Sequence, residues 1–438
     1  MKLAPILLAG LLVAVSGFSN AATPAGNTLE DFYTAALNFS PQLKIARERW
    51  NIGSARKDQN NGRLLPQVNA NASISQNDTV QQGIDSSFVG ERYSLTVSQV
   101  LFNWQAFAAR SQAYLLENQA EAEYYADLGV LLTDVADKYL AVLQAEDTLL
   151  SIESELEAMD NQIAQIQRLF DLQLALITNL YQAQARQAAL QADLVDAQSQ
   201  LTLAREALSV VTGLEAGSLS RLPDTIAITP LDEDLDSWVA RSRDGNPLIQ
   251  ARSYALEAAD KRVSSQRGTY LPQVSLIYQF QQSNLGFQNI RTTTIENNYI
   301  GIDVQIPLFA GGSNRATVRE AYSQRNIAEE ELRRTELEVE QRTTNAFLLV
   351  KNGESRIDAG QVLAESTATA YDAMQRGYEL NTVTSVDLLN ALRDTFNAER
   401  QLQQARYDHI RANLLLLRES GTLSPDDLLQ VSRQLNQR

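Results

Sequence analysis

The feature that most constrains the fold of this chain is an internal repeat. Three segments of the first half recur in the second half, in the same order and at an offset of 206 to 208 residues. Chance supplies one such match, but not three at nearly constant spacing, so the chain is predicted to contain two copies of one structural unit. The matching pairs are residues 65–68 with 271–274, 101–102 with 308–309, and 170–183 with 378–391.

Each half has the same predicted order of elements: a helix, two strands, a very long helix, a tight break and another helix. The opening helices are expected at 29–64 and 235–269. Proline and glycine in the segment between the halves indicate an irregular connection. A positively charged start, a short apolar run and small residues predict a signal peptide. The predicted divisions are a signal peptide at 1–22, a first repeat at 23–213, a connecting segment at 214–246, a second repeat at 247–421 and a C-terminal tail at 422–438.

Four segments alternate apolar and polar residues, as strands with one apolar face do. Each is about ten residues long, the length that crosses a bilayer when tilted. An ordinary half-buried sheet in a soluble domain has the same period, so alternation alone does not decide between the two. Four strands do not close a barrel, for which about eight are needed. If the strands span a membrane, the chain must therefore assemble with further copies of itself. The segments are 67–77, 92–98, 274–281 and 300–306.

Long helices are predicted at 105–171 and 314–377, because neither segment contains proline. At 1.5 Å per residue, each is about 100 Å long. A heptad spacing of apolar residues between Ile152 and Phe170 indicates a coiled-coil seam. After breaks at 174–178 and 381–385, new helices are expected to fold back as antiparallel hairpins. Thr384 or Ser385 is predicted to cap the second of these helices, with an acidic residue in its first turn.

Composition excludes several classes of protein. The net charge of −16 argues against binding nucleic acid, and the absence of cysteine excludes disulfides and thiolate metal sites. His409 is the only histidine and is expected on a helix surface, so no metal site is predicted. No set of residues for nucleophilic catalysis is available, and no phosphate-binding loop is present, so the chain is expected to be neither an enzyme nor a protein with a cofactor.

Over nearly its whole length the chain resembles the TolC family of outer-membrane efflux and type I secretion channels. The resemblance rests on the two Leu-Pro-Gln strand entries, the Ile-Pro-Leu-Phe-Ala-Gly-Gly junction at 306–312, and the second hairpin tip at 377–391. It implies an α+β membrane protein: a homotrimer with a twelve-stranded outer-membrane β-barrel, four strands per chain, continued into the periplasm by a barrel of helical hairpins. It also implies a passive exit duct that meets a periplasmic adaptor protein and an inner-membrane RND or ABC transporter. A coiled-coil structural or adhesin-like stalk is the alternative, but it leaves the duplicated strand pairs unexplained.

The resemblance also implies roles for residues at the hairpin tips. Asp387 and Asn390 match a polar pore constriction at the periplasmic gate. Tyr378, Asn179 and Val383 match contacts that lock the gate, although two of these positions carry no charge here. The cargo, whether drug, metal ion or protein, is not indicated by the sequence. The tip positions expected to contact the adaptor are Leu172, Gln173, Leu174, Leu380, Asn381 and Thr382.

Overall fold

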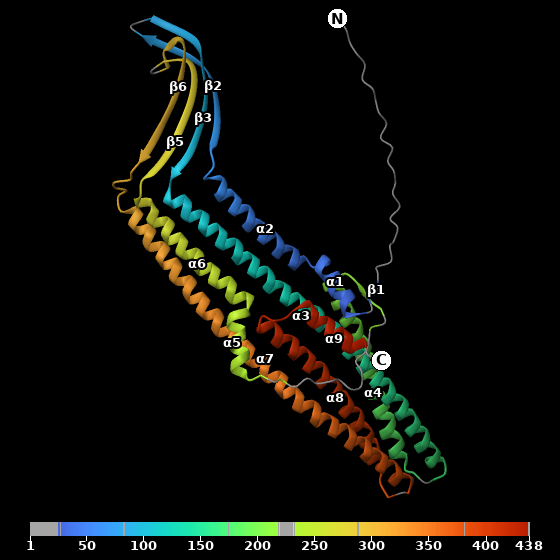
Figure 1. The fold of residues 1–438 in the computed structure, drawn as a ribbon. Coiled ribbons are helices and arrows are strands. Elements are labelled where there is room, and N and C mark those ends of the chain that lie inside the picture. The colour runs from blue at the N-terminus through green and yellow to red at the C-terminus, as the bar shows by residue number, and fades with distance from the viewer. Residues whose placement is uncertain are drawn as a thin grey trace, which may run out of the picture.

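The computed structural model describes residues 25–26, 28–81, 84–173, 175–217, 219, 231, 233–286, 289–380 and 382–436. It is an elongated molecule with a sheet at one end and two helical hairpin tips at the other (Figure 1). Among these residues, no helix is apolar over enough of its length to cross a membrane. The predicted signal peptide lies outside the described residues.

The sheet contains four antiparallel strands in the order β2-β3-β5-β6. They are β2 (Gln67–Gln81), β3 (Ile84–Phe102), β5 (Gln273–Leu285) and β6 (Arg291–Gln305). The expected length of about ten residues was wrong, because the strands contain 13 to 19 residues. Segments rich in Asn, Gln, Ser and Thr continue the hydrogen-bonded ladder beyond the apolar part of each strand.

The strand register places the four apolar stripes on one face of the sheet. Val68 pairs with Val97, Leu95 with Phe280, and Tyr278 with Ile300, so the stripes lie side by side. None of the described helices covers this face, and Ile300, for example, is 71% exposed. Polar residues such as Asn69 and Thr96, which also pair with each other, occupy the opposite face. The sheet therefore separates an apolar surface from a polar one.

The opening helix of each half is two helices rather than one, which corrects the prediction. They are α1 (Leu29–Phe39) and α2 (Pro41–Gly62), and α5 (Leu235–Gly245) and α6 (Pro247–Arg267), which is followed by the short η1 (Gly268–Tyr270). Proline prevents the preceding residue from staying helical, so each chain segment bends before Pro41 or Pro247. Ser40 and Asn246 then cap the new helices with their side-chain oxygens.

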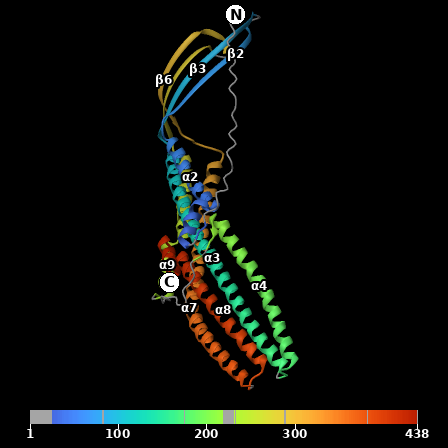
Figure 2. The same ribbon diagram turned by 90° about the vertical axis from the view of Figure 1, so that its right-hand side faces the viewer.

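The long helices form one curved layer. They are α3 (Trp104–Asp171), α4 (Ile177–Thr212), α7 (Ser313–Glu379) and α8 (Ser385–Glu419). Near the sheet the order across the layer is α2-α3-α6-α7, and toward the tips it is α4-α3-α8-α7 (Figures 1 and 2). The two hairpins, α3–α4 and α7–α8, form as predicted. Gly213 follows α4 in the left-handed conformation that ends many helices.

A compact core lies at mid-height, where α1 packs on α3 and α4. Phe32 and Tyr139 are fully buried there and meet edge to face at 5.8 Å between ring centroids. Most of the segment at 422–438, which we called a C-terminal tail, is the helix α9 (Pro425–Asn436), which packs on α1 and α3. Nearby, β1 (Ala25–Gly26) pairs in parallel with β4 (Glu215–Ala216).

His409 is buried, with 4% of its surface exposed, so its expected place on a helix surface was wrong. It lies against Gly353 of α7, which has no side chain to keep α8 at a distance. The Nε2 atom of its ring is 3.0 Å from the side-chain amide of Asn413. Burial lowers the pKa of this imidazole below its ordinary value of 6.5, and the Glu354 carboxylate opposes that shift.

Candidate functional site

The tip of the second hairpin is built around a capping box at the start of α8. The Thr384 hydroxyl oxygen accepts a hydrogen bond from the backbone N–H of Asp387 at 3.2 Å. In return, the Asp387 carboxylate accepts bonds from the Thr384 backbone N–H at 3.2 Å and hydroxyl at 2.6 Å. Two backbone donors of the first turn are thereby satisfied. These bonds lower the pKa of the Asp387 carboxyl, so the group is charged at neutral pH.

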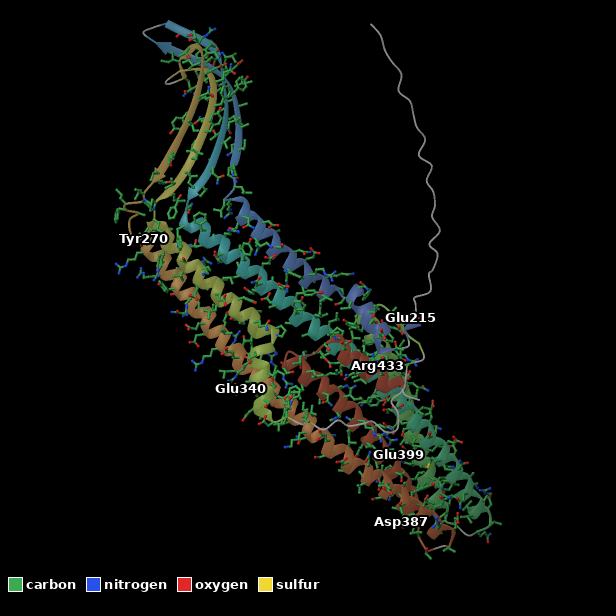
Figure 3. The ribbon with its side chains drawn as sticks, viewed as in Figure 1. Glu215, Tyr270, Glu340, Asp387, Glu399 and Arg433 are labelled. Carbon is green, nitrogen blue, oxygen red and sulfur yellow. The ribbon has the colours of Figure 1, made fainter. Side chains whose placement is uncertain are left out.

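Asp387 and Asn390 are both exposed and lie three residues apart on one face of α8. Asp387 is at the end of the molecule farthest from the sheet (Figure 3). The opposite face of the same turns is apolar, because Leu389 and Leu392 are buried in a cluster with side chains of α3 and α4 that includes Met159. This packing fixes which way α8 is turned and directs the two polar side chains away from the apolar cluster.

The three predicted lock residues do not form a polar network within the chain. Tyr378 packs against the apolar cluster at the tip, and burial raises the pKa of its hydroxyl above the ordinary value. No hydrogen bond joins Tyr378 to Asn179 in the part of the chain that the structure describes, and Asn179 is half-buried. Val383 is half-buried and lies over Gly377, where a β-carbon would come within 2.4 Å of it.

The tip of the first hairpin contains a residue in an unfavourable backbone conformation. Gln173 has φ of 63°, in the left-handed region, which costs about 1–2 kcal/mol for a residue with a β-carbon. Its neighbour Leu172 is exposed, as is Leu380 at the second tip. Thr382 closes the second tip by donating from its backbone N–H to the Gly377 carbonyl at 2.8 Å. Leu174 and Asn381 lie outside the described residues.

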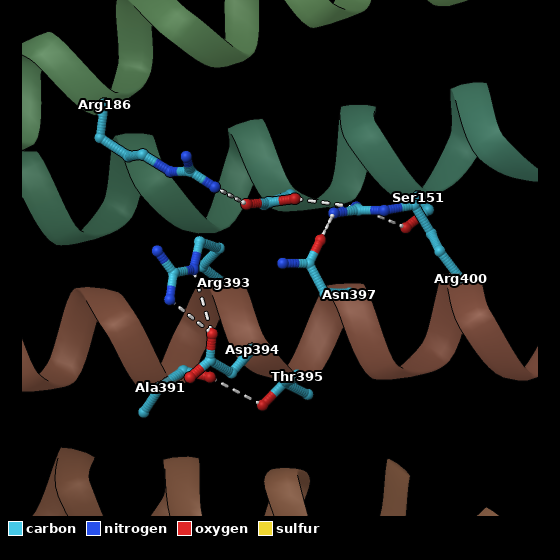
Figure 4. Close-up of polar contacts among 9 residues, drawn as sticks. Ser151, Arg186, Ala391, Arg393, Asp394, Thr395, Asn397 and Arg400 are labelled. Atoms are coloured by element: carbon cyan, nitrogen blue, oxygen red, sulfur yellow. Dashed lines mark hydrogen bonds and ion pairs between the residues drawn. The ribbon is translucent and has the colours of Figure 1, made fainter. Parts of the chain in front are cut away.

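A buried ionic cluster above the tips was not predicted. The Glu155 side chain on α3 is fully buried and meets Arg186 of α4 at 3.3 Å and Arg400 of α8 at 2.8 Å (Figure 4). Arg400 also donates to Ser151 at 3.2 Å and to Asn397 at 2.5 Å. The cluster therefore joins the two hairpins of one chain. The heptad spacing predicted a single helix partner for α3. In the structure α3 packs on both α4 and α8, and Glu155 lies where these two interfaces meet, so its role was not predicted.

Within the described residues, no group of three or more His, Cys, Asp and Glu side chains is arranged to hold a metal ion. The polar groups at the tips are also not arranged as a catalytic set, because Asp387 is engaged in helix capping and Tyr378 faces apolar side chains. What the tip region offers is a charged, exposed helix start supported by two packed hairpins. Such an arrangement suits contact and constriction rather than bond chemistry.

Comparison with known proteins places the fold and sequence in a defined group. The family model described as "Outer membrane efflux protein" matches residues 32–214 and 238–422. The chain is 28% identical to the outer membrane protein TolC of Vibrio cholerae serotype O1 over 441 residues, covering 99% of this chain and 98% of that protein. It is 24% identical to the alkaline protease secretion protein AprF of Pseudomonas aeruginosa, covering 92% and 86%. The solved outer-membrane channel OprN has a TM-score of 0.80 at 21% identity, covering 90% of both chains.

Proposed function

This chain belongs to the outer membrane efflux protein family, and from that premise we propose that it forms the outer-membrane exit duct of a tripartite efflux pump or a type I secretion system. The duct conducts substrates passively across the periplasm and the outer membrane. It is a passive conduit and not an enzyme, and its partners supply the energy for transport.

The observation that carries this proposal is the exposed apolar face of the sheet. From Val68 to Ile74 on β2, and over the paired parts of the other strands, apolar side chains cover one face and polar side chains the other. A sheet with these two faces separates lipid from a water-filled lumen. Its edge strands β2 and β6 have unpaired backbone groups, which are not tolerated in lipid, so the sheet has to be closed by other copies.

The helical layer has free edges at the same sides as the sheet. Toward the tips its edge helices are α4 and α7, and both carry exposed apolar side chains at helical spacing. Three copies joined edge to edge then give twelve strands and a closed ring of helices, so we propose a homotrimer. The exposed side chains are Tyr181, Val195, Leu203 and Val210 on α4, and Leu348, Leu349 and Val362 on α7.

The partners follow from the position of the tips. The exposed side chains of Leu172 and Leu380 lie at the end of the molecule opposite the membrane, where a periplasmic adaptor meets the duct, and an inner-membrane RND or ABC transporter completes the path. The relative AprF is named as a protein for secretion of alkaline protease, and this name favours a type I system with a protein cargo. The repeats at 23–213 and 247–421 each contribute one hairpin.

We place the periplasmic gate at Asp387 and Asn390. In a trimer, three charged Asp387 side chains around one axis narrow the pore and favour cations. The contacts that hold the gate closed depend less on salt than contacts between charged residues do. Val383 and Asn179 are uncharged, and Tyr378 packs against apolar groups. Restoring charges with Val383→Arg and Asn179→Asp is expected to make the closed-state conductance depend on salt; an unchanged dependence contradicts this assignment.

The test is single-channel recording of the detergent-purified protein in a planar bilayer at several salt concentrations. The wild type is expected to show a small, cation-selective conductance, which grows and loses selectivity in Asp387→Ala. Asp372→Ala, an equally acidic and exposed position on α7, serves as the matched control and is expected to behave like the wild type. A protein that forms no channels and stays soluble without detergent overturns the duct and favours a coiled-coil stalk.

A further inference from the structure

The charges of this chain are separated along its length. The helix segments next to the sheet, residues 56–63, 260–267 and 313–320, contain eight basic and three acidic side chains. Residues 157–171 and 372–394, which form the tips, contain three basic and seven acidic side chains. The end of the helical layer beside the sheet is therefore positive, although the whole chain has a net charge of −16.

The basic residues beside the sheet are exposed and available. We call Arg56, Arg63, Lys261, Arg262, Arg315 and Arg319 the basic collar. None of them forms an ion pair with a residue that the structure describes. By contrast, Lys57 in the same region is tied to Glu117 at 2.7 Å and is not counted in the collar. These exposed cations are therefore available to an anionic partner outside the chain.

Large apolar and aromatic side chains project from the same level. Leu308 and Phe309, at the junction of β6 and α7, are 92% and 88% exposed. Trp104 and Tyr270 are also exposed at this boundary, where Figure 3 labels Tyr270. Trp and Tyr rings with neighbouring Arg and Lys are typical of the level at which lipid headgroups meet water.

A groove of about 480 Å³ opens between the start of α3, the end of α6 and α7. The guanidinium of Arg267 lies in it, 5.1 Å from the centre of the Tyr322 ring, and donates a hydrogen bond to the Tyr322 hydroxyl. Trp104 donates to the Ser264 hydroxyl at 3.1 Å, and Asp260, which is paired with Arg325, lines the lower part. An arginine with hydroxyl groups beside it is suited to a phosphate group.

We propose that the basic collar and this groove bind the phosphate headgroups of anionic phospholipids in the membrane leaflet that faces the helices. The proposal rests on the duct function, because it requires the sheet to span the membrane. Arg63 lies five residues before Val68 of the apolar band, so the nearest charges of the collar lie within about 10 Å of the headgroups, the range over which such attraction persists. Each basic residue near an anionic surface increases binding about fivefold.

The experiment measures which lipids surround the protein. The trimer is reconstituted into phosphatidylcholine vesicles in which about 30% of the lipid is anionic phosphatidylglycerol. Either phosphatidylcholine or phosphatidylglycerol carries the bromine label, in separate samples. Quenching of Trp104 fluorescence then reports the ratio of anionic to zwitterionic lipid beside the collar, and Trp104→Phe identifies this signal. The wild type is expected to prefer phosphatidylglycerol by about fivefold or more at low salt, and less as salt is added.

Two variants and a control decide the outcome. Arg63→Gln, Arg315→Gln and Arg319→Gln together, and Arg267→Gln alone, are each expected to lower this preference. Arg333→Gln with Arg334→Gln removes exposed charges from α7 farther from the sheet and is expected to leave it unchanged. Equal quenching by both lipids in the wild type overturns the proposal. Channel recordings from the same vesicles separate this proposal from the duct function. Conductance without a lipid preference refutes lipid binding by the basic collar and leaves the duct function standing.

Discussion

Arg400→Met is expected to loosen the contact between the two hairpins of each chain. The change leaves the carboxylate of Glu155 fully buried with Arg186 as its one remaining charged partner. Removing one member of a buried ion pair costs about 3–5 kcal/mol, since the other charge stays desolvated. Because Arg186 remains and Arg400 itself is 23% exposed, the lower value of about 3 kcal/mol applies.

Hydrogen exchange of backbone amides measures this loss where it arises. A loss of about 3 kcal/mol corresponds to exchange on the order of 100-fold faster in the turns of α8 around residue 400, if these amides exchange by local opening. Amides of α2, far from the cluster, are expected to exchange at the wild-type rate. The double variant Glu155→Gln with Arg400→Met removes the stranded charge and is expected to recover much of the protection. If the double variant exchanges as fast as the sum of both single variants predicts, the two side chains act independently and the reasoning is refuted.

Three further predictions concern individual residues. Gln173→Gly is expected to stabilise the first tip by about 1 kcal/mol, because glycine adopts a positive φ without strain, and slower local hydrogen exchange checks this. Asp387 has a lowered pKa in the folded state, so its capping contribution to stability is present above pH 3.8 and is lost as the pH falls through the lowered value. In Thr384→Ala, which lacks the hydroxyl that bonds the carboxylate, the second tip is expected to lose less stability in acid than in the wild type. His409 also has a lowered pKa, so the imidazole binds a proton more tightly in the unfolded chain and stability falls as the pH drops below 6.5. Thermal unfolding of His409→Gln between pH 7 and 5 is expected to lack this loss of stability. An equal loss in the variant and the wild type counts against the prediction.

Much of the fold was predictable because it is periodic. The alternation of residues in the strands and the unbroken helical segments identified the sheet, the two hairpins and their order. The strand ends were not predictable, because polar residues such as Gln76 and Asn77 pair across the sheet with Val89 and Phe88 without any alternation of apolar side chains. Backbone hydrogen bonds, which hold these ends together, leave little trace in the sequence.

The site was predicted unevenly. Thr384 and Asp387 were placed correctly in a helix cap, since capping depends on a short local spacing. Glu155, Arg186 and Arg400 are distant in sequence and meet only when three helices pack together, so no local pattern reports them. The burial of His409 depends on the absence of a side chain at a glycine on another helix, which likewise cannot be read from its own neighbours.

The continuity of α3 has a mechanical consequence. It runs for 68 residues from the sheet to the first tip without a proline or a break, and α7 runs for 67 residues to the second tip in the same layer. Such helices bend gently over many turns rather than folding at one point. A partner that draws apart the proposed gate at the tips is therefore expected to bend these two helices along their length and to store elastic strain in them. On release of the partner we expect the helices to relax, so that the gate closes again without an energy source of its own.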